Sequence, residues 1–211
     1  NTTGGSNTAI GHGSLGANTT ASNNVAVGAS ALIDNTTGAN LVAVGSSALA
    51  NNTTASYNVA VGYQAGMTVT TGAGNTYLGH AAGAYCTTGA NNVIIGHIAG
   101  DAVTTGHTSV IIGQSAGTAM TTASENVLIG NNVAALLTTG AQNIIIGDNA
   151  AAGAAVTGNG STIVGDNCGY HQTSAAANAY YGAAAGHNTT TGGGNTCIGH
   201  SAGYGITTGV N

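Results

Sequence analysis

The side chains that could hold a metal or act in acid–base chemistry are few in this chain of 211 residues: seven histidines, three cysteines and five acidic residues. His80 and His97 occupy the same place in successive units of the repeat described below, and His12 and His200 fall at matching places in it. Imidazole nitrogens at regular spacing suit zinc and related metals. The same place is held elsewhere by Ala29, Ser46, Tyr63, Gln114, Asn131 and Asp148. We therefore interpret it as a solvated polar column and predict no metal site.

Other candidate motifs for catalysis or cofactor binding lack the neighbouring elements or the residue spacing that such sites need. Gly11, Gly13 and Gly16 satisfy the dinucleotide pattern G-x-G-x-x-G, but no helix and no ribose-binding acid follow in a βαβ unit. The three cysteines have no C-x-x-C spacing, which argues against a disulfide framework or a zinc site. The acids, which show no repeated pairing, are Asp34, Asp101, Glu125, Asp148 and Asp166. We expect neither a carboxylate pair nor a calcium loop, and we predict a protein that is not an enzyme and uses no cofactor.

Composition excludes further classes of function. The chain contains no Lys, Arg, Pro, Phe or Trp, and its net charge is −5. Binding to nucleic acid or to anionic membranes depends on clustered cations, so we predict neither partner. No apolar run approaches the roughly 18 residues of a membrane span. The scarcity of large apolar side chains argues against a thick globular core and favours a thin architecture.

A 17-residue repeat fills the chain. Twelve short apolar segments each end in a glycine, and successive glycines keep this period except at one interval, which is longer by a single residue. These anchor glycines, taken as position 0 of each repeat, are Gly11, Gly28, Gly45, Gly62, Gly79, Gly96, Gly113, Gly130, Gly147, Gly165, Gly182 and Gly199. The extra residue falls in the alanine-rich stretch 150–155, where we expect a bulged loop. We predict one array over residues 1–211, without a second domain, excised from a longer chain.

Each column of the repeat has its own chemistry. A Thr-Thr pair stands at positions −9 and −8, and Gly or Ala at −7 indicates a tight corner or a close backbone approach. Asn recurs at position −4, where stacked amides can bond one another along the axis. The predicted ladder includes Asn24, Asn58, Asn75, Asn92, Asn126 and Asn143. The predicted turn glycines include Gly28, Gly45, Gly62, Gly79, Gly96 and Gly113.

The short β-rich segments predict a parallel β-solenoid. Runs such as 25–27, 93–95 and 144–146 are bounded by Asn and Gly, so they indicate strands, and a unit of this length can hold two short strands and two turns per coil. Positions −3 and −1 share one face of the strand and position −2 points the other way. Both faces are apolar, and strands of that kind are normally covered on both sides. We expect the second face to be covered by another chain.

Two columns exchange volume along the array. Where position −2 is Ala in the first three repeats, position +4 is Leu15, Leu32 or Leu49. Where position −2 becomes Tyr, Ile or Leu, position +4 becomes Gly83, Gly100, Gly117 or Ala134. Added volume at one position of a close-packed core must be removed from another. We predict that both columns fill one shared interior.

Residues 24–40 (NVAVGASALIDNTTGAN) and the matching segments along the whole chain resemble the repeats of phage tail-fibre proteins and related bacterial surface proteins. The Val-Ala-Val-Gly core is similar to the head repeats of trimeric autotransporter adhesins, although this chain uses a longer coil. The resemblance implies a left-handed parallel β-roll, a homotrimer and a role in attachment. It implies an extracellular fibre shaft, on a virion tail or a bacterial cell surface, that positions an attachment tip.

Two alternatives concern the outer surface. Exposed residues that include Tyr63, His80 and His97 are candidate contacts for a host-surface glycan or protein. A regular threonine array can also bind ice, but adjacent threonines send only one side chain outward per coil. The simpler interpretation is hydroxyl-to-backbone hydrogen bonding near the turn. Sequons such as those at Asn18, Asn35 and Asn188 are candidate glycosylation sites.

Overall fold

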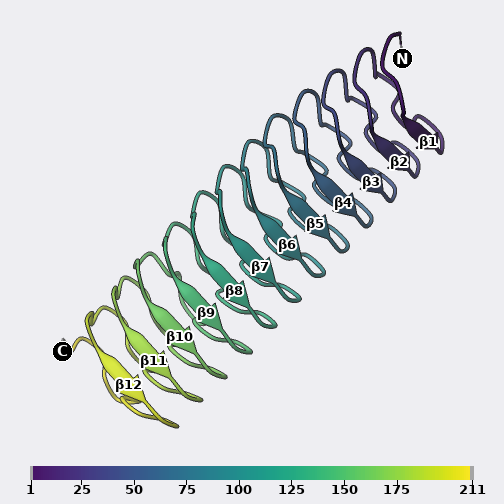
Figure 1. The fold of residues 1–211 in the computed structure, drawn as a ribbon. Coiled ribbons are helices and arrows are strands. Elements are labelled where there is room, and N and C mark those ends of the chain that lie inside the picture. The colour runs from purple at the N-terminus through teal and green to yellow at the C-terminus, as the bar shows by residue number, and fades with distance from the viewer. Residues whose placement is uncertain (1, 210–211) are drawn as a thin grey trace.

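A computed structural model of the chain describes residues 2–209. The described residues contain twelve three-residue strands and no helix, which confirms the all-β solenoid. The strands are β1 (Thr8–Ile10), β2 (Val25–Val27), β3 (Val42–Val44), β4 (Val59–Val61), β5 (Thr76–Leu78), β6 (Val93–Ile95), β7 (Val110–Ile112), β8 (Val127–Ile129), β9 (Ile144–Ile146), β10 (Thr162–Val164), β11 (Ala179–Tyr181) and β12 (Thr196–Ile198). Figure 1 shows them stacked in chain order along a rod, with the termini at opposite ends. The predicted array limits at residues 1 and 211 lie outside the described residues.

All twelve strands form one parallel sheet in which each strand pairs with the next along the chain. Ala26 lies opposite Ala43, which is a shift of one repeat, and Ile145 lies opposite Ile163 across the longer interval. Backbone bonds between coils continue beyond the strands, as from the Leu32 amide to the Ala48 carbonyl (3.1 Å). Each coil therefore stacks directly on its neighbour, and residues at the same position of successive repeats lie opposite each other.

Every strand ends immediately before an anchor glycine, and these glycines adopt backbone angles that other residues avoid. The φ angle of Gly45 is 136°. A Cβ atom at Gly45 would overlap the carbonyl oxygen of Gly62 in the next coil. Glycine is required here because it adopts this φ without strain and because it has no Cβ atom to collide with the neighbouring backbone. The same range of φ, 133° to 137°, holds for the six predicted turn glycines.

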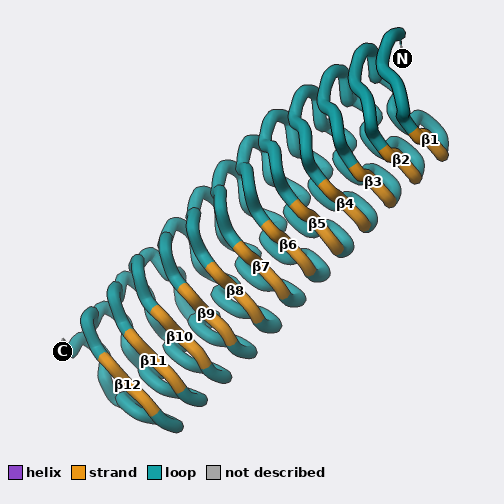
Figure 2. Tube along the Cα trace, in the orientation of Figure 1, coloured by secondary structure: helices purple, strands orange, loops and turns teal. Residues whose placement is uncertain are grey.

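The second strand predicted for each coil does not form. Figure 2 shows strands on one side of the coil and turns around the rest of it. Residues at positions −5, +2 and +4 have positive φ, as in Asn91 (58°), Ile98 (50°) and Gly100 (49°). Left-handed residues at such short intervals cannot be part of an extended strand. The prediction of two strands per coil is therefore wrong, and a strand alternates instead with a chain of tight turns.

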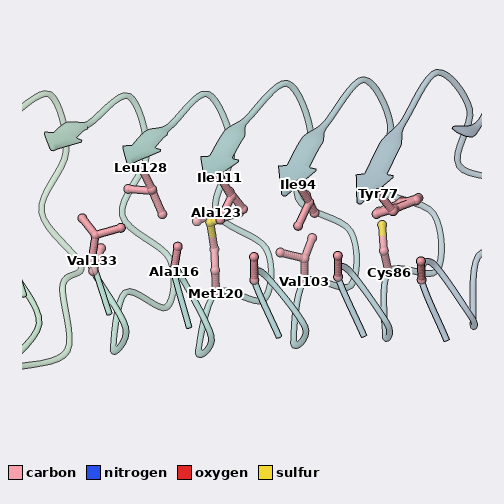
Figure 3. Close-up of a cluster of buried hydrophobic side chains, with 14 of the residues drawn as sticks. Tyr77, Cys86, Ile94, Val103, Ile111, Ala116, Met120, Ala123, Leu128 and Val133 are labelled. Atoms are coloured by element: carbon pink, nitrogen blue, oxygen red, sulfur yellow. The ribbon is translucent and has the colours of Figure 1, made fainter. Parts of the chain in front are cut away.

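The core lies inside the coil and is one side chain deep. The middle residue of each strand from β2 to β11 is fully buried, while its two neighbours face outward. Figure 3 shows Tyr77 and Ile94 pointing from their strands toward Cys86 and Val103 on the opposite wall. Alternation along the strand thus sends position −2 inward, as predicted.

The predicted exchange of volume between positions −2 and +4 is confirmed. Leu32 and Leu49 belong to the same buried cluster as the small Ala43. Tyr77 fills the corresponding space farther along, since a Cβ atom on Gly66 or Gly83 would overlap its ring. The large side chain comes from the strand in one part of the rod and from the opposite turn in the other.

The one longer coil carries its extra residue away from the sheet. The Gly153 amide bonds the Tyr170 carbonyl, one residue farther along the chain than in the equivalent bond from Thr68 to Ala84, so the extra residue follows Gly153. The Thr138 amide bonds the Val156 carbonyl, one residue farther than in the equivalent bond from Thr121 to Thr138, so the extra residue precedes Val156. The extra residue therefore lies between Gly153 and Val156, within the predicted stretch 150–155. The Val156 side chain turns inward and is fully buried, so the core remains filled.

Candidate interaction surface

The outward side of the sheet is a continuous surface that runs along the rod from β1 to β12. We call the side chains at positions −3 and −1 of the twelve strands the strand face. Position −3 holds Val, Ile, Thr or Ala, and position −1 holds Ile, Val, Leu or Tyr. Several of these side chains are well exposed, including Leu78 (45%), Ile144 (43%) and Tyr181 (43%). A continuous apolar surface of this kind is a mark of an interaction site.

Charge is excluded from the strand face. The five acids of the chain all lie on other columns: Asp34, Asp101, Glu125, Asp148 and Asp166. Three of them accept a hydrogen bond from a side-chain amide on the surface: Gln142 donates to Glu125 (2.9 Å), Asn131 to Asp148 (3.0 Å) and Asn167 to Asp166 (3.0 Å). Burial raises the pKa of the Asp101 carboxyl. The strand face can therefore be desolvated without burying a charge.

Tyr63, His80 and His97 stack at the corner that follows the strand, and we call these three residues the corner stack. The ring centroids of Tyr63 and His80 are 5.4 Å apart, and those of His80 and His97 are 5.0 Å apart. Interplanar angles of 22° and 25° make the rings nearly parallel. Their faces cover one another, and their edges remain available for hydrogen bonds from a bound glycan or protein.

The corner stack is poorly shaped for a metal. Imidazole lone pairs lie in the ring plane, so two nearly parallel rings direct their nitrogens side by side rather than toward one ion. Residues 2–209 contain no group of three or more His, Cys, Asp or Glu side chains that could hold a metal ion. The described coils also enclose no pocket.

The asparagines at position −4 have a structural role that differs in detail from the predicted ladder. All six predicted residues are buried. Asn92, for example, donates to the Gly106 carbonyl (2.8 Å) and accepts from the Ser109 amide (3.0 Å) of the next coil. A direct amide-to-amide bond also occurs, from Asn75 to Asn58 (3.2 Å). The column is a ladder, but most of its rungs join a side chain to the backbone.

The two threonines of each pair face different environments. The first hydroxyl donates to the carbonyl of the first threonine in the next coil, as from Thr87 to Thr104 (3.1 Å). The second, represented by Thr88 and Thr105, is exposed. This arrangement matches the prediction of hydroxyl-to-backbone bonding. It leaves one exposed threonine column, whereas a matched ice-binding surface needs two.

Two of the candidate glycosylation sites belong to a second asparagine column and are inaccessible because their side chains are buried. Asn18 and Asn35 are buried, and together with Asn52 they form an amide ladder with distances of 3.3 Å and 2.8 Å. A glycan cannot be attached to these side chains in the folded coil. Asn188 is half-buried and lies beside His187, with its Oδ1 atom 3.0 Å from the ring nitrogen.

A second aromatic cluster was not predicted from the sequence. Tyr170, His187 and Tyr204 stack along the axis with centroid distances of 5.4 Å and 4.8 Å. His171 lies edge-on to Tyr170 and to His187, at interplanar angles of 87° and 83°. The three stacked residues share position +5 of their repeats, and this aromatic run in one column was the available signal.

The three cysteines are free and buried. Burial raises the pKa of the Cys86 thiol, and it raises the pKa of Cys168 to about 12. Cys86 donates to the Gly89 carbonyl and Cys168 to the Ala185 carbonyl. These thiols are protonated core residues at neutral pH and not nucleophiles.

Within residues 2–209, no helix is long and apolar enough to cross a membrane. No protein-family model, curated protein or solved structure matches the chain.

Proposed function

We propose that the protein is a non-enzymatic structural rod, the shaft of an extracellular fibre, in which identical chains pack side by side through the strand face. The observation that carries this proposal is the uncharged, apolar strand face that continues from β1 to β12. Covering such a face removes its apolar side chains from water and so favours association.

The size of the strand face fits a stable interface. Two outward side chains on each of twelve strands make about two dozen residues, within the roughly 20–30 residues per side found in specific complexes. The partner must also match the axial repeat. A second copy of the chain has the same coil height, so its side chains can meet those of the first along the whole rod.

The resemblance to tail-fibre and adhesin repeats supports three copies and a place on a virion tail or a bacterial surface. A shaft of this kind needs rigidity and length. Stacked coils supply both, because each coil is stabilised by its nearest neighbours and the rod lengthens by adding repeats.

Light scattering tests the assembly. We expect a trimer at micromolar concentration. A variant with Val110→Asp and Ile112→Asp places two charges on the strand face and is expected to be a folded monomer with an unchanged circular dichroism spectrum. Gln114→Asp, which adds charge at an exposed position off the strand face, is the control and should remain trimeric. A monomeric unsubstituted chain would contradict the proposal.

A second candidate function is direct attachment through the corner stack, which presents three ring edges in a row. Binding of the assembled rod to a glycan array or to host cells would be measured for the unsubstituted chain and for Tyr63→Ala with His97→Ala. Retained binding in this variant would assign attachment to a different surface.

A further inference from the structure

The strand face is so uniform that it does not by itself fix how two copies align. The outward residues of β2, β3 and β4 are identical, with Val at both positions, and those of β6, β7 and β8 are all Val and Ile. A copy shifted by one coil would meet almost the same surface. A regular rod made of identical chains therefore needs a marker that distinguishes the correct register from a slipped one.

Strand β11 carries the strongest irregularity of the strand face. Among the outward positions of the described strands, Tyr181 is the one aromatic residue, and Ala179 on the same strand is the smallest side chain. Tyr181 is 43% exposed. The largest and the smallest outward residues thus occur at the two outward positions of one strand.

The symmetry of a side-by-side assembly brings these two residues together. When copies are related by rotation about an axis parallel to the rod, equal coils lie at equal height. In such a rotation the strands of successive copies follow one another around the axis in the same sense, so position −1 of one copy approaches position −3 of its neighbour. We propose that the Tyr181 ring seats over Ala179 of the neighbouring copy and thereby sets the register of the assembly. This inference rests on the proposed self-association.

Slipped arrangements lose this fit. A shift of one coil would place Tyr181 against Thr162 or Thr196, which are larger than Ala179, and overpacking of a close contact is destabilising. An antiparallel alignment of two fully overlapping rods keeps the strand direction and would place it against Val27. The in-register parallel arrangement is the one in which the small residue receives the large one.

Photo-cross-linking at a distant coil tests the register. Val44→p-benzoyl-L-phenylalanine puts a photoreactive group on β3, whose outward neighbours on β2 and β4 are identical to its own. Peptide mass spectrometry of the cross-linked dimer then identifies the strand that it touches. We expect β3 of the neighbouring copy. A shift by one coil gives β2 or β4, and an antiparallel alignment gives β10.

The decisive comparison removes the marker. With Tyr181→Val, we expect cross-links to spread over β2, β3 and β4 while light scattering still shows an assembly. Tyr63→Val, which removes an aromatic residue from outside the strand face, is the matched control and should keep cross-links on β3. Unchanged cross-links in Tyr181→Val, or cross-links to β10 in the unsubstituted chain, would overturn the role of Tyr181 although self-association stands. A monomeric unsubstituted chain would instead remove the proposed function itself.

Discussion

At the scale of single residues, the thin coil depends on side chains that complete backbone hydrogen bonds. The Asn92 amide donates to the Gly106 carbonyl, and its oxygen accepts from the Ser109 amide. Both partners are backbone groups of buried residues that lie outside the strands. Buried backbone groups without partners are costly, so polar side chains inside the coil stabilise the fold.

Asn92→Leu removes both of these bonds while keeping a similar volume. We expect a loss of about 1–3 kcal/mol for each backbone group left unpaired, measured as the free energy of unfolding in urea. Asn91→Gly is the control, because Asn91 is exposed and has a φ of 58° that glycine adopts easily. A small effect of Asn92→Leu would mean that water replaces the amide.

Ile98 is a residue under backbone strain. Its φ is 50°, a left-handed conformation that β-branched side chains avoid. Asn stands at the same position in three later repeats, at Asn132, Asn149 and Asn167. We expect Ile98→Asn to stabilise the chain by about 1 kcal/mol, seen as a higher urea midpoint. Gln114→Asn, at an exposed position without positive φ, should leave the midpoint unchanged.

Ionisation of the Cys168 thiol is expected to lower the stability of the fold at alkaline pH. Burial raises its pKa to about 12, above the ordinary value of 9.0. The unfolded chain therefore loses this proton first, and stability falls as the pH rises from about 9 toward 12. We expect Cys168→Ala to unfold with a weaker pH dependence over that range in urea titrations. An identical slope in both proteins would assign the effect to other groups.

At the scale of the element, the alternation of strand residues could be predicted, and the turns could not. Val, Ile and Ala at positions −3 to −1 have a period of two that fixes which side chain faces the core. The second strand was mispredicted because Leu32, Leu49 and Ile98 have no intrinsic preference for positive φ. Coil-to-coil hydrogen bonds and core packing impose that conformation on them, and a single sequence does not show either.

The strand face could also be anticipated, since apolar residues on both sides of a strand are visible in the sequence. The partners of the asparagines could not, because they bond backbone atoms of the next coil that lie far along the chain, as from Asn75 to Gly89. The cluster around His187 was missed for a different reason. It occupies a column whose earlier members include no aromatic residue and are mostly small, so the repeat consensus conceals it.

The shared interior of Tyr77 and Gly83 predicts strong coupling between two substitutions. Tyr77→Ala leaves a cavity and is expected to cost about 3–5 kcal/mol. Gly83→Leu alone overlaps the ring. The double variant reproduces the native pairing of Ala43 with Leu49, so its cost should be well below the sum of the two single costs. Calorimetric melting of all four proteins measures this, and additive effects would contradict a common cavity.

At the scale of the whole molecule, the absence of cationic side chains predicts how stability depends on salt. The chain has no Lys or Arg and a net charge of −5, so added salt screens only repulsion between acids. As sodium chloride is raised from about 0.05 to about 1 M, we expect the assembly to persist. The melting temperature should stay the same or rise by about a few degrees at most. Dissociation at high salt would point to attractive charge interactions that the sequence does not provide.

The restriction of hydrogen bonds to neighbouring coils determines how the rod responds to force. Its inter-coil bonds join each coil only to the ones above and below, so tension along the axis loads them one coil at a time. A coil that opens changes from about 5 Å of rod to roughly 55–60 Å of extended chain. The coil containing Gly153 is the natural place to start, because its outer wall is one residue out of step with the sheet. A single chain is therefore expected to lengthen coil by coil once the tension exceeds what the inter-coil bonds withstand, and the proposed side-by-side assembly would share that tension among several chains.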